Sequence, residues 1–153
     1  MLSVVRSHWE IGSKVLTDMF IPGASIEETD AFAKNQRESA TPEVAAGYLE
    51  LVYSADVTEA ARLIKAPTIV LHRQGDRAIP IAGGHQLAAF VPGAHFVPLE
   101  GRAHTPRDAE EAEELVALID DHLLADGALS PTATASSATS AASEVQVILF
   151  TDL

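Results

Sequence analysis

The chain has 153 residues, enough for one folded domain, and its 22 acidic and 10 basic side chains give a formal net charge of −12. This charge argues against nucleic acid and against an anionic membrane surface as partners, because phosphate groups would repel the protein. No cysteine is present, so disulfides and thiolate metal sites are excluded. Since no apolar run of about 18 residues appears, we expect no membrane span. A cytoplasmic location suits this composition.

Residues 1–65 are predicted to form a helical region. A break at Pro22-Gly23 ends a first helical segment, and Ser25 can cap the next one. Thr41, followed by proline, has the pattern of another helix start. The apolar residues of that helix recur at spacings of three and four and predict a buried face formed by Val44, Tyr48, Leu51 and Val52.

Strands and helices are predicted to alternate further along the chain. A β-branched apolar run predicts a buried strand over Thr68–His72. A helix is expected over Ile81–Phe90 and a second short strand over His95–Leu99. A last helix is expected over 108–125, since its acidic first turns suit the positive end of the helix dipole.

Two side chains suited to proton transfer follow the two predicted strands. Asp76 comes just after the first strand, and His104 comes just after the second. Because the carboxyl ends of parallel strands meet at one edge, where ligands bind, we expect a hydrogen bond of about 2.6–3.2 Å between them. The residues alone leave a simpler alternative, in which Asp76 caps a turn and His104 is a solvated loop side chain. His72, at the end of a strand, is near both and can help to shape the pocket.

Four segments together resemble the C-terminal part of an α/β-hydrolase: Ala66–His72, Gly75–Pro80, Val91–Ala94 and Leu99–His104. The resemblance implies an α/β fold class. It would be a partial α/β-hydrolase fold, with parallel strands and flanking helices over 66–126, preceded by a helical cap over 1–65.

The same resemblance implies a function. Asp76 would be the acid and His104 the base of a Ser-His-Asp triad, the catalytic residues of an esterase-like serine hydrolase. The substrate would be a small-molecule ester or a related ligand, and this region would need no cofactor.

The nucleophile of such a triad is missing from this chain. The family places its serine upstream of the acid on a Gly-x-Ser-x-Gly turn, and the sequence contains no such pentapeptide. The chain therefore resembles the downstream portion of a hydrolase, and we expect it to be inactive alone. We also expect self-association through the exposed edge of its short sheet.

The C-terminal residues suggest a second unit. Residues 127–144 are rich in Ser, Thr and Ala and are predicted to form a flexible linker. Residues 145–153 resemble the first strand of a class III adenylyl/guanylyl cyclase domain, which implies that Asp152 is a magnesium ligand. Magnesium would be needed only if the cyclase domain were complete. An alternative therefore stays open: a hydrolase-like module that senses a ligand and regulates an adenylyl cyclase.

Overall fold

The computed structural model describes residues 1–125. The linker predicted over 127–144 and the cyclase-like segment predicted over 145–153, with Asp152, lie outside these residues. The elements in the described part are α1 (Leu2–Ser7), α2 (Trp9–Phe20), α3 (Ile26–Ser39), α4 (Pro42–Ser54), α5 (Thr58–Arg62), β1 (Ile69–Arg73), α6 (Ile81–Phe90), β2 (His95–Leu99) and α7 (Ala109–Ala125).

The predicted fold class, α/β with a partial α/β-hydrolase fold, is wrong. Helices contain 62% of the described residues and strands 8%. The sheet within this part of the chain consists of one parallel pair, β1 and β2. The physical reason lies in the sequence pattern: only Ile69–Arg73 and His95–Leu99 form strands here, whereas the first 62 residues are divided into successive capped or closely packed helices.

The helix starts predicted at Ser25 and Thr41 are confirmed. Ser25 Oγ accepts a hydrogen bond from the backbone N–H of Glu28, and the Glu28 carboxylate accepts one from the N–H of Ser25 at 2.7 Å. This reciprocal pair is a capping box. The hydrogen bond from the Ser25 backbone N–H is the main reason why the pKa of Glu28 lies below its ordinary value of 4.5. Thr41 Oγ1 accepts from the backbone N–H of Val44 at the start of α4.

The core of the helical region lies where α1, α2 and α4 meet. Val5, Leu16 and Ala46 are buried there, and Trp9 and Phe20 pack against them. A glycine, Gly12, lets α1 and α2 approach closely, because a Cβ atom at this position would lie 2.9 Å from Val5 Cα.

The buried face predicted for α4 is wrong. Val44 is 61% exposed and Leu51 is 64% exposed, whereas Ala46 is fully buried. Helix α4 contacts α1 through the small side chains around Ala46. Among its larger apolar residues, Leu49 packs against this core, whereas Val44 and Leu51 are mostly exposed.

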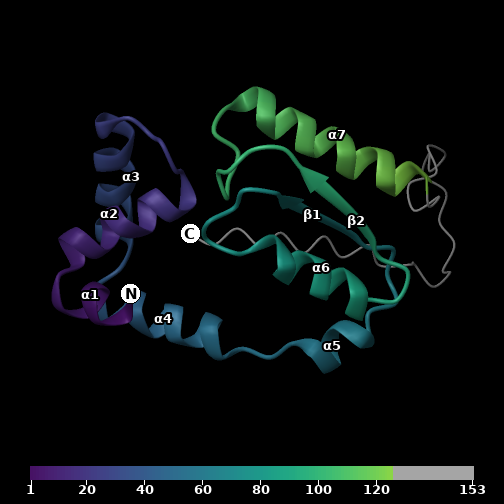
Figure 1. Ribbon diagram of the computed structural model, residues 1–153, viewed down its shortest axis with the longest axis horizontal. Helices are drawn as coiled ribbons and strands as arrows, with labels where there is room; N and C mark the ends of the chain where they lie inside the picture. The colour runs from purple at the N-terminus through teal and green to yellow at the C-terminus, as the bar shows by residue number, and fades with distance from the viewer. Residues whose placement is uncertain (126–153) are drawn as a thin grey trace, which may run out of the picture.

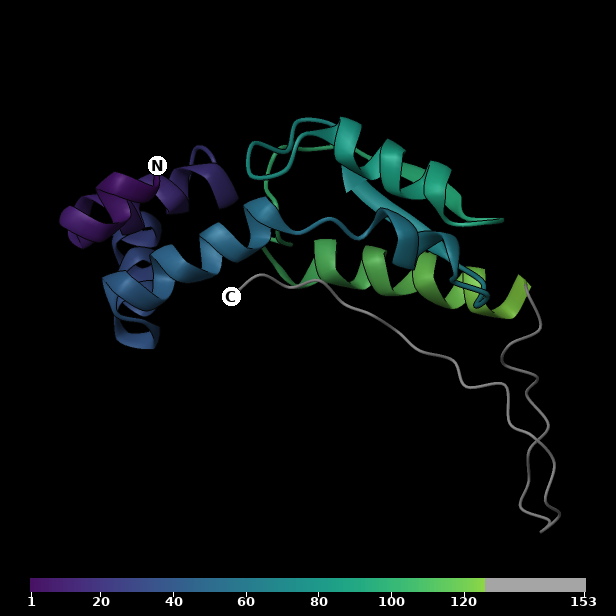
Figure 2. The same ribbon diagram turned by 90° about the horizontal axis from the view of Figure 1, so that it is seen from below.

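The two strands lie between two helices. Strand β1 pairs with β2 in parallel, with Ile69 opposite His95 and Arg73 opposite Leu99. Helix α6 connects the strands and covers one face of the pair, and α7 lies on the other face (Figures 1 and 2). Both strands point their carboxyl ends toward α2, so the loops that follow them meet the helical region (Figure 1).

Candidate active site

The loops that follow β1 and β2 are hydrogen-bonded to each other. The backbone N–H of Gln74 donates to Leu99 O at 2.9 Å, and that of Gly75 donates to Gly101 O at 3.0 Å. Glycine is needed at position 75 because a Cβ atom there would lie 2.6 Å from Arg102 Cγ. This close approach brings Asp76, on the first loop, beside His104, on the second.

The Asp76 carboxylate uses its two oxygens for different purposes. Oδ1 accepts hydrogen bonds from the backbone N–H groups of Ala78 at 2.8 Å and Ile79 at 3.1 Å. Oδ2 lies 2.7 Å from His104 Nδ1, and the Asp76 side chain is only 4% exposed. The sequence left turn capping and pairing with His104 as alternatives, and the structure shows both. The predicted hydrogen bond between Asp76 and His104 is confirmed.

The contact with Asp76 determines which ring nitrogen of His104 carries the proton. An ionised carboxylate can only accept, so His104 Nδ1 donates to Oδ2, and Nε2 of the neutral ring is left as an acceptor. The His104 side chain is 13% exposed, so solvent screens this pair only weakly. A buried imidazole oriented in this way can accept a proton at Nε2 while the carboxylate stabilises the resulting cation.

Helix α2 holds His104 from the other side. The backbone N–H of His104 donates to Phe20 O at 2.6 Å. The Phe20 and His104 rings meet edge to face, with centroids 5.2 Å apart. Sequence reasoning missed Phe20, and no motif marks it, because one of its two contacts with His104 is made by its main-chain carbonyl.

Two ion pairs also join the helical region to the site loops. Arg77, next to Asp76, pairs with Asp18 of α2 at 2.9 Å, and Arg107 lies 3.7 Å from the Glu28 carboxylate of α3. All four side chains are largely exposed, so each pair adds little to stability.

The third predicted neighbour, His72, lies beside the pair, as expected. Its Nε2 atom is 3.7 Å from Asp76 Oδ2 and 2.9 Å from Ile79 O, and its side chain is 11% exposed. The structure therefore brings together all three residues that the sequence placed at this edge of the sheet.

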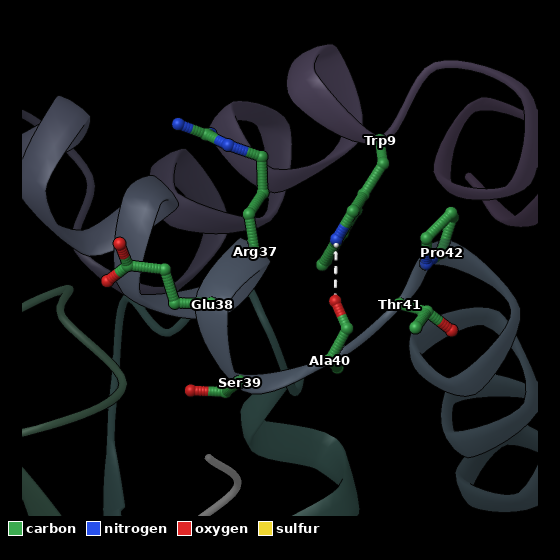
Figure 3. Close-up of a pocket in the computed structure, with 7 residues that line it drawn as sticks. All are labelled: Trp9, Arg37, Glu38, Ser39, Ala40, Thr41 and Pro42. Atoms are coloured by element: carbon green, nitrogen blue, oxygen red, sulfur yellow. Dashed lines mark hydrogen bonds between the residues drawn. The ribbon is translucent and has the colours of Figure 1, made fainter.

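A shallow depression of about 380 Å³ lies elsewhere, where α3 meets α4. Trp9 forms one side of it, and the indole N–H donates to Ala40 O at 3.0 Å across the gap (Figure 3). None of the residues that line this depression belongs to the Asp76–His104 pair. The indole joins α2 to the segment between α3 and α4, which is a packing role.

Residues 1–125 contain no group of three carboxylate or imidazole side chains arranged to hold a metal ion. The one predicted metal ligand, Asp152, lies outside the described part, so its role stays a prediction. None of the helices in the described part has the length and apolarity needed to cross a membrane.

Comparisons with protein families and with curated proteins do not assign a chemistry to this site. Neither the models of protein families nor the curated proteins give a match to this chain.

Proposed function

We propose that this chain supplies the acid and the general base of an esterase-like serine hydrolase, whose nucleophile comes from outside this sequence. The observation that supports the proposal is the 2.7 Å contact between Asp76 Oδ2 and His104 Nδ1, formed by two side chains that are almost fully buried. Carboxylates and imidazoles rarely share a buried position unless they pair, and this pairing leaves one imidazole nitrogen able to accept a proton.

The chemistry follows from the tautomer. A serine hydroxyl placed at His104 Nε2 would transfer its proton there as the oxygen attacks an ester carbonyl. Asp76 would stabilise the imidazolium, and the proton would then pass from Nε2 to the leaving alcohol. A water molecule, deprotonated in turn by Nε2, would then attack the acyl-serine and release the acid, and the proton would return to the serine oxygen. Acid, base and serine recur in this arrangement on unrelated folds, so the proposal does not depend on the architecture of an α/β-hydrolase.

The proposed substrate is a small-molecule ester, and the proposed location is cytoplasmic. The formal charge of −12 supports the choice of a small molecule over nucleic acid or an anionic membrane surface. The reaction would need no cofactor, because His104 would carry out its proton transfers while Asp76 stabilises the imidazolium.

The test uses the full-length protein that contains this chain. A fluorophosphonate probe, which phosphonylates activated serines, should label one serine outside residues 1–153. His104→Ala should slow that labelling by about 10²–10⁴-fold, the usual contribution of a general base. His85→Ala is the matched control, because this second histidine stacks on Phe96 with centroids 4.0 Å apart and lies away from the pair.

Two results would contradict the proposal: labelling that is equally fast in His104→Ala, or the absence of any labelled serine. The second result would instead favour the alternative function, a module that binds a ligand and regulates an adenylyl cyclase.

We also propose that the chain associates with itself through its sheet. In the described residues β1 and β2 pair only with each other, so each keeps one edge without a strand partner. Parallel strands usually have further strands beside them, and an open edge can pair with another chain. Sedimentation over a range of concentrations should show dimers or larger species, and a monomer at every concentration would contradict this.

A further inference from the structure

His72 is the fourth residue of β1, and its ring is enclosed between the site and helix α6. Its Nε2 atom lies 2.9 Å from Ile79 O. A carbonyl oxygen can only accept, so Nε2 must carry the proton and donate it. On the other side of the ring is Gly84 of α6, where a Cβ atom would lie 2.6 Å from His72 Nδ1. The ring therefore fits between α6 and the 76–79 turn only because position 84 has no side chain.

This hydrogen bond completes a closed set of contacts around the 76–79 turn. Ile79 donates its N–H to Asp76 Oδ1 and accepts from His72 at its carbonyl oxygen. The N–H of Asp76 donates to Arg73 O at 3.3 Å at the start of the turn. His72 thus anchors the last residue of the turn to β1, and the turn fixes the rotation of the Asp76 carboxylate.

The rotation of that carboxylate matters because only Oδ2 remains available to His104. Two backbone N–H groups occupy Oδ1, so the plane of the carboxylate is set by the turn. His72 Nε2 is 3.7 Å from Oδ2, too far for a hydrogen bond, and so it does not compete with His104. His72 acts on the acid through the turn and not by replacing the base.

We propose that His72 is a positioning residue, which holds the 76–79 turn so that Asp76 Oδ2 meets His104 Nδ1. The catalytic meaning of this role rests on the function proposed above, whereas the positioning itself is measurable without substrate or nucleophile. The required form of the ring is specific: His72 must be protonated at Nε2, and His104 must be protonated at Nδ1.

The test compares two replacements of nearly equal size. His72→Gln keeps an N–H donor at about the position of Nε2, and His72→Met has none. Imidazole ¹⁵N shifts of the full chain report the tautomer of each histidine, and amide hydrogen exchange reports the turn. In His72→Met, exchange at Ala78 and Ile79 should accelerate by about tenfold, as expected for the loss of one hydrogen bond. His104 should lose its fixed Nδ1–H tautomer.

His72→Gln should retain both signals. His85→Met, the same replacement at a histidine that stacks on Phe96, should leave the turn and His104 unchanged. Wild-type signals in His72→Met would overturn the proposal, and so would a folded His72→Gln that behaves like His72→Met. If neither variant folds, the wild-type spectrum decides: an Nδ1–H tautomer at His72 refutes the role, and an Nε2–H tautomer supports it. A failure of serine labelling, by contrast, would count against the proposed function alone.

Discussion

Replacing Asp76 by asparagine separates the two roles of its carboxylate. The amide oxygen of asparagine can still accept from the N–H groups of Ala78 and Ile79, as Oδ1 does now. The amide nitrogen then faces His104 Nδ1 as a donor, which forces the imidazole proton onto Nε2. The turn should remain, while His104 changes from a proton acceptor at Nε2 to a donor there.

The structure sets the size of the effect. The contact between Asp76 and His104 involves a charged acceptor and is nearly buried, so its complete loss in Asp76→Ala should cost about 1.5–3 kcal/mol of unfolding free energy, and its replacement by a neutral hydrogen bond in Asp76→Asn should cost less. Asp76→Ala loses the same contact and also leaves two backbone N–H groups without an acceptor. At about 0.5–1.5 kcal/mol for each ordinary hydrogen bond, alanine should be less stable than asparagine by about a further 1–3 kcal/mol.

Urea unfolding of wild type and of both variants measures these differences, provided that the slope with urea is unchanged. The ¹⁵N shifts of His104 report the tautomer in the same samples. The expected order of stability is wild type, then Asp76→Asn, then Asp76→Ala. Equal stability of the two variants would refute the reasoning, because it would mean that the turn does not depend on Oδ1. An unchanged His104 tautomer in Asp76→Asn would refute the assigned direction of the hydrogen bond.

Three further predictions follow from the contacts of the described residues. Gly84→Ala should lower stability by about 1–3 kcal/mol, because the new methyl group would clash with His72. Gly83→Ala, whose Cβ atom would lie an acceptable 3.5 Å from Ile79 Cγ2, should instead raise stability by up to about 1 kcal/mol in thermal unfolding. The Ser25 cap lowers the pKa of Glu28 in the folded protein, so this carboxylate stabilises the fold fully above pH 4.5. The stabilisation is lost as the pH falls through the lowered pKa of the folded state. Acid titration of Glu28→Gln should lack this part of the pH dependence, and an unchanged curve would contradict it. The chain alone should hydrolyse an activated ester no faster than free imidazole, and turnover that disappears in His104→Ala would disprove this.

Local features of the fold were predictable from the sequence. The capping serine and threonine were identified because a cap depends on a few adjacent residues. The bounds of α6 and β2 were also predicted correctly, because they follow from the local pattern of apolar residues. The hydrogen bond between Asp76 and His104 followed from strand order alone, since parallel strands bring their carboxyl ends to one edge.

Features that depend on distant neighbours were not predictable. The fold class was wrong because it depends on how many strands assemble, and residues 1–125 contain only two. The buried side of α4 was wrong because this helix is apolar around much of its surface. The side that contacts α1 is the one that contains Ala46, and periodicity alone cannot show which apolar side of a helix is buried.

The two oxygens of the Asp76 carboxylate have different partners, and this affects how the same chemistry can be recognised in other sequences. One oxygen maintains the 76–79 turn whether or not the other ever takes part in a reaction. A chain without this activity would therefore still gain stability from an aspartate at this position. An aspartate at position 76 is therefore weak evidence for this chemistry unless a histidine stands beside it at position 104.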